Sequence, residues 1–191
     1  VDLPGEVRGM IPNADYYTKH YGNYWRAVTV ISIAIGQGEV TLTPLQIANL
    51  GATIANRGTY ITPHMVKAIE GDTIRQDYLT PKSTLVGRKS YEHIVEGMRL
   101  AVTDGTCRAA NIPGLDVCGK TGTAQNPHGK DHSTFLSFAP KDNPKIAISV
   151  YVEFGGFGAT IALPIASLLE EYYLTDTITR PQLVDTIQNF P

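Results

Sequence analysis

The sequence predicts an α+β fold in which helices flank an antiparallel sheet. Apolar residues recur at helical spacing over residues 43–56 and again over residues 89–102. Three later segments have the composition of strands, and the tight turn at residues 140–144 joins the last two, so these should pair antiparallel. The apolar segment 161–174 then predicts a helix that covers one face of the strands. Because three strands are few for an independent sheet, we expect the sheet to be incomplete in this chain.

Composition excludes several classes of protein. The chain has 191 residues, enough for one domain or the larger part of one, and 42% of them are apolar. Its 16 basic and 18 acidic residues nearly balance, without a block of like charge, which argues against a nucleic-acid partner. No run of about 18 apolar residues is present to span a bilayer. The histidines show no metal-ligand spacing, so we expect no metal and no cofactor. The chain begins at Val1 rather than methionine, which we interpret as a cut or processed chain.

The first third of the chain contains one clear helix signal. Residues 1–34 are rich in glycine, proline and tyrosine, and we expect an irregular segment that lies over the surface of something else. The Gly36–Gly38 segment follows. A helix should begin at Thr43, which can cap it, with Gln46 at the capping-box position. Residues 56–58, Asn-Arg-Gly, should end it.

The remaining elements follow in order along the chain. Short strands and turns are expected over residues 60–79, and a helix over residues 89–102 that ends at Asp104 and Gly105. The three candidate strands and the final helix are residues 115–124, 134–139, 146–154 and 161–174. We expect residues 1–175 to form one structural unit, and residues 176–191 to be a tail that is either a short helix or loose.

Two cysteines, Cys107 and Cys118, leave two alternatives open. They could form a disulfide that closes a short loop in an oxidising compartment. We favour two free, buried thiols, because nothing in the sequence determines their relative geometry.

The segment from Gly114 to Thr121 satisfies the phosphate-binding pattern G-x-x-x-x-G-K-[ST]. A phosphate-binding loop requires a strand before its first glycine and a helix that begins at its lysine. Here a poor strand precedes Gly114, and glycine, asparagine and proline follow Thr121 closely, so no helix should begin there. The context of this segment therefore argues against a nucleotide-binding loop.

The alternative reading is a Lys-Thr-Gly motif, Lys120, Thr121 and Gly122, on an edge strand beside a cleft. The lysine supplies a fixed positive charge, and the hydroxyls of Thr121 and Thr123 can hold a substrate carboxylate. Gly122 has no side chain, so a substrate backbone can lie against the strand as an added strand, with Ala124 at its end. A backbone N–H next to the glycine, that of Thr123, can help to stabilise an oxyanion. If the motif has no function, Lys120 is simply an exposed lysine on an edge strand.

Several further segments accompany this motif. In order, they are residues 2–6 (Asp-Leu-Pro-Gly-Glu), 35–38 (Ile-Gly-Gln-Gly), 43–48 (Thr-Pro-Leu-Gln-Ile-Ala), 56–58, 63–64, 119–125 (Gly-Lys-Thr-Gly-Thr-Ala-Gln), 131–133, 138–140 and 144–147. Together they resemble the C-terminal part of the transpeptidase domain of class B penicillin-binding proteins, and within that family the elongation-type penicillin-binding protein 2. The resemblance runs collinearly from residue 1 to about residue 174 and is much more specific than any single triplet.

The resemblance implies an acyl transfer through a serine ester, for which the family uses Ser-x-x-Lys and Ser-x-Asn motifs. None of the serines in this chain has lysine three residues later or asparagine two residues later: Ser32, Ser83, Ser90, Ser133, Ser137, Ser149 and Ser167. In the family both motifs precede the matching region. We therefore expect a chain that retains the substrate-binding strand, lacks the nucleophile and is inactive alone.

The family also implies partners and a location. A parent protein would cross-link peptidoglycan stem peptides on the periplasmic or extracytoplasmic face of the bacterial cytoplasmic membrane, held by an N-terminal helix. It would be acylated by β-lactam antibiotics, and would work with a membrane glycosyltransferase and elongation-complex proteins. Asp131 and His132, in the loop after the Lys-Thr-Gly strand, either line the cleft or orient this loop, and we favour the second role for His132. A non-catalytic module that binds peptidoglycan or another protein stays open as an alternative.

Overall fold

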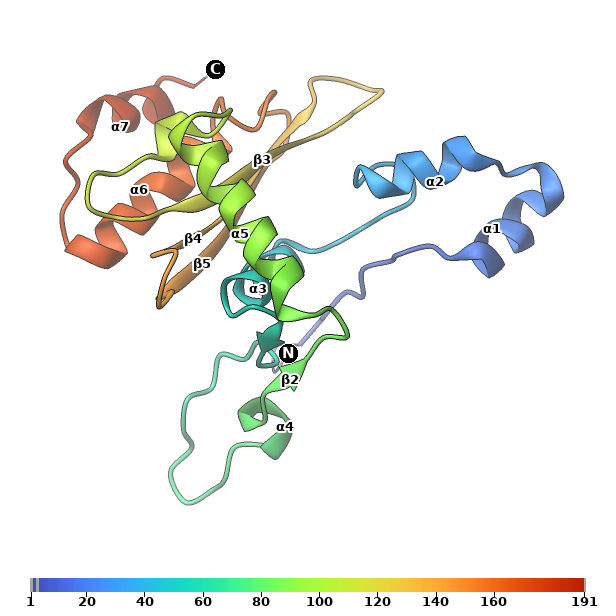
Figure 1. Ribbon diagram of the computed structural model, residues 1–191, viewed down its shortest axis with the longest axis horizontal. Helices are drawn as coiled ribbons and strands as arrows, with labels where there is room; N and C mark the ends of the chain where they lie inside the picture. Colours follow the sequence, from blue (N-terminus) through green and yellow to red (C-terminus); the bar gives the residue numbers. More distant parts are fainter. Residues whose placement is uncertain (1, 3, 191) are drawn as a thin grey trace.

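The computed structural model describes residue 2 and residues 4–190. Its elements are α1 (Ala14–Tyr21), η1 (Gly22–Tyr24), α2 (Ala27–Ala34), α3 (Pro44–Ala55), β1 (Thr59–Tyr60), α4 (Gln76–Leu79), β2 (Lys82–Ser83), α5 (Arg88–Thr103), η2 (Arg108–Ala110), β3 (Cys118–Ala124), β4 (His132–Ala139), β5 (Ile146–Val152), α6 (Ala162–Thr175) and α7 (Pro181–Gln188). The strands β3, β4 and β5 form a three-stranded sheet, and Figure 1 shows helices on both sides of it, with the α1–α2 segment and the α4 segment projecting away from it.

The three longer strands form one antiparallel sheet in the order β3-β4-β5, as predicted. Thr121 of β3 pairs with Phe135 of β4, and Phe135 pairs with Val150 of β5. The hairpin β4–β5 lies at the predicted turn. β3 begins at Cys118, three residues later than expected, because residues 112–115 form a turn with an isolated bridge between Ile112 and Leu115.

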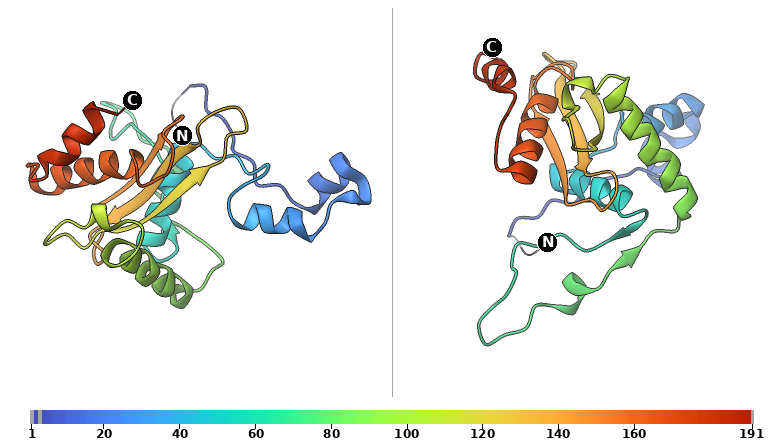
Figure 2. Two further views of the ribbon diagram at one scale, coloured as in Figure 1. Left: turned by 90° about the horizontal axis from the view of Figure 1, so that it is seen from above. Right: turned by 60° about the vertical axis from the view of Figure 1, so that its left-hand side comes forward.

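The two faces of the sheet pack against different helices, because side chains alternate along each strand. Phe138 and Cys118 share one face with residues of α3 and α5, including Ile54 and Val95. Phe135 lies on the other face and belongs to the cluster that contains the α6 residues Leu163 and Ala166. Figure 2 shows α6 on one side of the sheet and α5 on the other. The predicted α+β arrangement, with helices flanking an antiparallel sheet, is confirmed.

Helix α3 begins and ends where the sequence predicted, with the capping interactions that were expected at each end. The Thr43 hydroxyl accepts a bond from the Gln46 N–H at 3.2 Å, and the Gln46 side chain accepts one from the Thr43 N–H at 2.9 Å. At the other end of α3, Arg57 and Gly58 take positive φ values of 55° and 100°, which end the helix.

The N-terminal region differs from the prediction. Residues 1–34 were expected to be irregular, yet they contain α1, η1 and α2. The Asn13 side chain caps α1 by accepting the Tyr16 N–H at 2.9 Å. Helix α2 contains no buried residue, and its Val28 and Ile31 are 74% and 61% exposed. The prediction was wrong because neither the tyrosine-rich segment nor the mainly apolar α2, which is broken only by Thr29 and Ser32, has a clear amphipathic period.

Residues 60–79 were expected to form short strands with turns, and the strand part of this prediction was wrong for most of the segment. The structure has the two-residue strand β1, which pairs with β2, and the single-turn helix α4. The run from Met65 to Ala68 is a loop, whereas a turn at Glu70 and Gly71, closed by an isolated bridge between Ile69 and Asp72, lies where a turn was expected.

Both cysteines are free and buried, as favoured from the sequence. Cys107 belongs to the cluster on the α6 side of the sheet, whereas Cys118 belongs to the cluster on the α3 and α5 side. A disulfide between them would have to cross the sheet, so the disulfide alternative does not hold in this structure.

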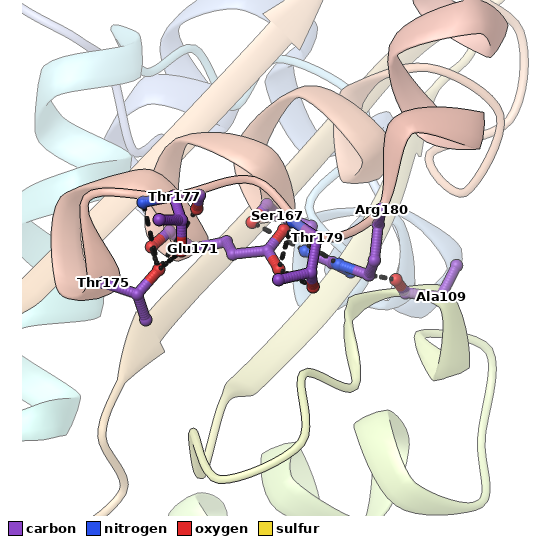
Figure 3. Close-up of polar contacts among 7 residues, drawn as sticks. All are labelled: Ala109, Ser167, Glu171, Thr175, Thr177, Thr179 and Arg180. Carbon is purple, nitrogen blue, oxygen red and sulfur yellow. Dashed lines mark hydrogen bonds and ion pairs between the residues drawn. The ribbon is translucent and has the colours of Figure 1, made fainter.

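The C-terminal helix α7 is tied to the body by a buried ion pair (Figure 3). The Arg180 guanidinium lies 3.0 Å from the Glu171 carboxylate of α6, and it also donates to the carbonyls of Ser167 and Ala109 at 3.0 Å each. The Thr179 N–H donates to the same carboxylate at 3.2 Å. Residues 181–188 form a short helix without buried residues, and Arg180 at its start fixes it to α6.

Candidate active site

The Lys120–Gly122 motif lies in the middle of β3, an edge strand of the sheet. No helix begins at Lys120, because residues 118–124 are extended and pair with β4 throughout. The backbone N–H groups of an extended strand alternate in direction and cannot converge on a phosphate in the way that a glycine-rich loop does. The structure therefore contradicts the phosphate-binding alternative.

The backbone of β3 presents Thr121 and Thr123 to its open edge. The Thr123 carbonyl accepts a bond from Gln37 Nε2 at 3.0 Å, and the Thr121 carbonyl accepts one from Lys120 Nζ at 2.8 Å. Both carbonyls therefore point away from β4. In an antiparallel strand the N–H and C=O of one residue point to the same side, so the N–H groups of both threonines also face the open edge.

A groove of about 620 Å³ runs along this strand on the α3 side of the sheet. Lys120, Gly122 and Ala124 of β3 form one wall, and residues of α3 together with the linker before it form the other. Among the described residues that line it, Lys120 alone carries a charge. Because the remaining walls are largely apolar, the groove can attract an anionic group to one position.

Gly122 is required by the packing of the sheet. A Cβ at this position would stand 2.6 Å from Cγ2 of Thr134, its partner on β4. Substitution would therefore push β3 away from β4 or displace the Thr134 side chain. The result is a strand whose surface beside Lys120 is bare backbone, as expected for a strand that receives an added strand.

The hydroxyls of Thr121 and Thr123 lie on the opposite face from the Lys120 side chain, since the face alternates from one residue to the next. The Thr121 hydroxyl lies 3.3 Å from that of Thr106, and the Thr123 hydroxyl accepts the Gly158 N–H at 3.4 Å. The structure thus brings Lys120 to the groove, and it brings the two threonine backbones, rather than their hydroxyls, to the open edge.

Asp131 and His132 organise the end of the β3–β4 hairpin. The Asp131 carboxylate accepts the Asn126 N–H at 3.0 Å, and the His132 ring accepts the Phe154 N–H at 3.0 Å through Nδ1. The His132 ring also packs against Tyr151 and Phe154. Neither residue is among those that line the groove, so both contacts agree with the loop-orienting role rather than the cleft-lining role.

Two residues at this edge were not predicted as site residues. Gln37 contacts Thr123 across 86 positions of sequence, and Gly158 lies against the backbone of Gly122. The signal in the sequence that could have drawn attention to Gln37 was the Gly-x-Gly spacing around it, because this spacing indicates a tight turn. The sequence alone contained nothing that placed this turn next to β3.

The comparisons with known proteins agree with this geometry. Residues 1–169 match the family model of the penicillin binding protein transpeptidase domain. The chain is 36% identical to the peptidoglycan D,D-transpeptidase MrdA of Acinetobacter baumannii and 33% identical to that of Haemophilus influenzae. These alignments cover 91% and 93% of this chain, but only 28% and 31% of the two relatives.

Solved structures show the same relationship. Penicillin-binding protein 2 of Pseudomonas aeruginosa superposes with a TM-score of 0.81 at 32% identity, over 92% of this chain and 39% of that protein. Penicillin-binding protein 2 of Helicobacter pylori, solved in complex with MreC, gives a TM-score of 0.74 at 29% identity, over 92% of this chain and 33% of that protein. Penicillin-binding protein A of Mycobacterium tuberculosis, solved as an imipenem acyl-enzyme, gives 0.69 at 31% identity, over 81% of this chain and 36% of that protein.

The resemblance predicted from the sequence is therefore confirmed for the family and for the fold. The chain spans less than a third of the length of these two curated relatives, and the family model covers most of the chain. We conclude that the chain belongs to the penicillin-binding protein transpeptidase domain family.

Proposed function

We propose that this chain forms the substrate-binding wall of a peptidoglycan D,D-transpeptidase. The observation that carries the proposal is the open edge of β3, to which the N–H and C=O groups of Thr121 and Thr123 point, beside a groove in which Lys120 is the one charged residue among the described lining residues. A peptide that ends in D-Ala-D-Ala can add to this edge as a strand and direct its terminal carboxylate toward Lys120.

The other residues have roles that follow from their positions. The Thr123 N–H points to the open edge, where it can donate to the oxyanion of a tetrahedral intermediate. Gly122 has no side chain and Ala124 has only a methyl group, so a peptide backbone can approach the strand closely at these two positions. The Thr121 and Thr123 hydroxyls lie on the face opposite the Lys120 side chain, where they contact Thr106 and Gly158, so in this proposal the two threonines act through their backbone groups. Asp131 and His132 hold the adjacent hairpin end.

The reaction proceeds through a serine ester. A serine oxygen attacks the carbonyl carbon of the penultimate D-alanine, the peptide bond breaks, and the terminal D-alanine leaves with the serine proton. An amine of a second stem peptide then attacks the ester, which forms the cross-link and returns a proton to the serine. In this chain the serines lack the Ser-x-x-Lys spacing, and Ser133, Ser137 and Ser167 are fully buried. The nucleophile therefore comes from sequence outside these residues.

We extend the proposal to partners and location by likeness to the relatives. The imipenem acyl-enzyme of the mycobacterial protein supports β-lactams as ligands of the complete site, and the MreC complex of the Helicobacter pylori protein supports an elongation-complex partner. A membrane glycosyltransferase partner and a position on the extracytoplasmic face of the cytoplasmic membrane belong to the same proposal. Among the described residues no helix has the length and apolarity needed to cross a bilayer. We place residues 1–175 in the transpeptidase unit and residues 176–191 in a C-terminal tail.

A titration with a short peptide tests the binding role without requiring catalysis. Amide signals of the ¹⁵N-labelled chain are followed while an acylated Lys-D-Ala-D-Ala peptide is added. We expect the largest shifts at residues 121–124, a loss of affinity in Lys120→Ala, and no comparable shifts with the L-Ala-L-Ala peptide. Lys145→Ala, an exposed lysine that does not line the groove, is the matched control. Shifts that are absent from β3, or that are equal for both peptides, would refute the proposal.

A further inference from the structure

The side chain of Gln37 occupies a hydrogen-bonding position on the open edge of β3. Its carboxamide donates to the Thr123 carbonyl at 3.0 Å, and the contact is partly buried. This carbonyl is one of the acceptors that a strand-like ligand would use, because its N–H and C=O both face the open edge. The donor in the structure is an amide N–H, which is chemically equivalent to a ligand backbone N–H.

We propose that Gln37 acts as an internal mimic of the ligand backbone, so that the Gly36–Gly38 turn is a displaceable cap that lowers the affinity of this edge for strand-like ligands. The inference rests on the proposed function, because it assumes that the edge receives a peptide strand. Gln37 is thus a residue that affects ligand affinity without taking part in the chemistry.

The turn around Gln37 is built so that its side chain reaches β3. Gly36 and Gly38 have φ values of +74° and +71°, a conformation that side chains rarely adopt. A Cβ at Gly36 would meet nothing within 4 Å, so this glycine is required by its conformation rather than by space. The Gln37 N–H bonds to the Ser32 carbonyl at 3.0 Å, which holds the turn to the end of α2.

The residue after the turn is attached to α1. The Glu39 carboxylate accepts the Tyr17 hydroxyl at 2.6 Å and the Tyr21 hydroxyl at 2.9 Å. Of the hydrogen bonds made by the described part of residues 14–39, the bond from Gln37 is the one that joins this segment to the sheet. Displacement of Gln37 therefore releases the contact between the α1–α2 segment and the site edge, whereas the turn and its anchor on α1 stay intact.

The cost of displacing the cap is small. The ligand replaces one amide donor by another at the Thr123 carbonyl, so the hydrogen bond is exchanged rather than lost. The Gln37 side chain belongs to the same chain as β3, so its effective concentration at the Thr123 carbonyl is high. Gln37 therefore lowers the apparent affinity of every ligand that bonds to this carbonyl. Removal of the carboxamide should therefore strengthen binding by roughly three- to tenfold, the value of one exchanged hydrogen bond.

The test compares three forms of the 191-residue chain: the unchanged chain, Gln37→Ala, and Gln182→Ala, an exposed glutamine on α7 that serves as control. Calorimetry measures the Kd for an acylated Lys-D-Ala-D-Ala peptide. We expect Gln37→Ala to bind three- to tenfold more tightly than the other two forms. Equal or weaker binding by Gln37→Ala would overturn the inference, since Gln37 would then be neutral or would itself contact the ligand.

A second measurement separates failure of this inference from failure of the proposed function. Hydrogen exchange of the side-chain amides is followed by NMR on the free chain, with the Gln182 carboxamide as reference. A Gln37 carboxamide that exchanges several times more slowly than that of Gln182, together with a shift of the Ala124 N–H in Gln37→Ala, supports the cap. If no form binds the peptide, the proposed function fails while these signals still report the cap. Equal exchange rates would overturn the cap whatever the peptide does.

Discussion

Gly158 packs directly on the backbone of Gly122, from the face of the sheet opposite the groove. A Cβ on Gly158 would stand 2.9 Å from the Gly122 nitrogen and 2.5 Å from the Thr134 carbonyl oxygen, and closer still to the Gly122 carbonyl oxygen. The Gly158 N–H also reaches the Thr123 hydroxyl at 3.4 Å. The glycine-rich loop before α6 therefore packs against the Lys-Thr-Gly strand on the face opposite the groove, and this contact helps to determine the position of β3.

Gly158→Ala should consequently destabilise the chain and displace β3. The added methyl group meets backbone atoms on two strands, which cannot move aside independently, so we expect a loss of about 1–3 kcal/mol in the free energy of unfolding. Urea denaturation followed by circular dichroism measures the loss. Gly87→Ala is the matched control, because a Cβ there would meet nothing within 4 Å. A Gly158→Ala variant as stable as this control would show that the contact does not hold the strand.

Glu170 should make the stability of the chain fall as pH rises. This α6 residue is fully buried, and neither carboxyl oxygen has a hydrogen-bond partner among the described residues. Burial raises the pKa of Glu170 to about 8, from the usual 4.5. Between these two values the folded state keeps a proton that the unfolded state releases, so the stabilisation present at low pH is lost as the pH rises through about 8.

Glu170→Met removes this titration. We expect the variant to be more stable than the unchanged chain at pH 8, on the order of 1–3 kcal/mol, with little difference at pH 4.5. Urea denaturation at a series of pH values measures both effects. Glu153→Gln, a change at an exposed carboxyl group, should leave the pH dependence intact. A pH profile of Glu170→Met that parallels that of the unchanged chain would contradict the prediction.

The neighbouring residue Glu171 should have the opposite pH dependence. Burial raises its pKa, but the hydrogen bonds from Thr179 and the Arg180 guanidinium outweigh burial and hold the pKa below the usual 4.5. Its contribution to stability is therefore present above that value and is lost as the pH falls through the lowered pKa. The pKa values of two adjacent carboxyl groups on one helix thus shift in opposite directions, because Glu171 is hydrogen-bonded to Arg180 and Thr179, whereas burial dominates at Glu170.

Glu171→Ala should cost about 3–5 kcal/mol at pH 7, because it leaves the buried Arg180 guanidinium without its counterion. The loss should shrink at low pH, where the unchanged chain loses the same interaction. Thermal and urea denaturation at pH 7 and pH 3 measure the difference, and Asp185→Ala on the exposed side of α7 is the control. A loss below about 1 kcal/mol at pH 7 would mean that the pair acts like an exposed surface ion pair.

These examples also show which parts of the structure can be predicted from sequence. Helix α3 was predictable because its cap, its proline and its terminating glycine lie in the helix or within three residues of its ends. The helices of the α1–α2 segment were not predictable in the same way. Helix α2 is mainly apolar, and the sequence shows no separate polar and apolar faces from which a helix could be recognised. At the site, Lys120 was identifiable from its residue type and context. The Gln37 contact was not, because it joins positions 86 residues apart and depends on the path of the chain between them.

The absence of a nucleophile can be tested by acylation with a labelled penicillin. The family reaction needs a serine with a lysine three residues later, and no serine of this chain has that spacing. Three of the serines are also fully buried against α6, where an antibiotic cannot approach: Ser133, Ser137 and Ser167. We therefore expect intact-mass spectrometry to find no penicilloyl adduct on the 191-residue chain after prolonged incubation, whereas a chain extended to include the Ser-x-x-Lys motif should gain one equivalent. A stoichiometric adduct on any serine of the present chain would show that the chain carries its own nucleophile, and the proposed division of the site would be wrong.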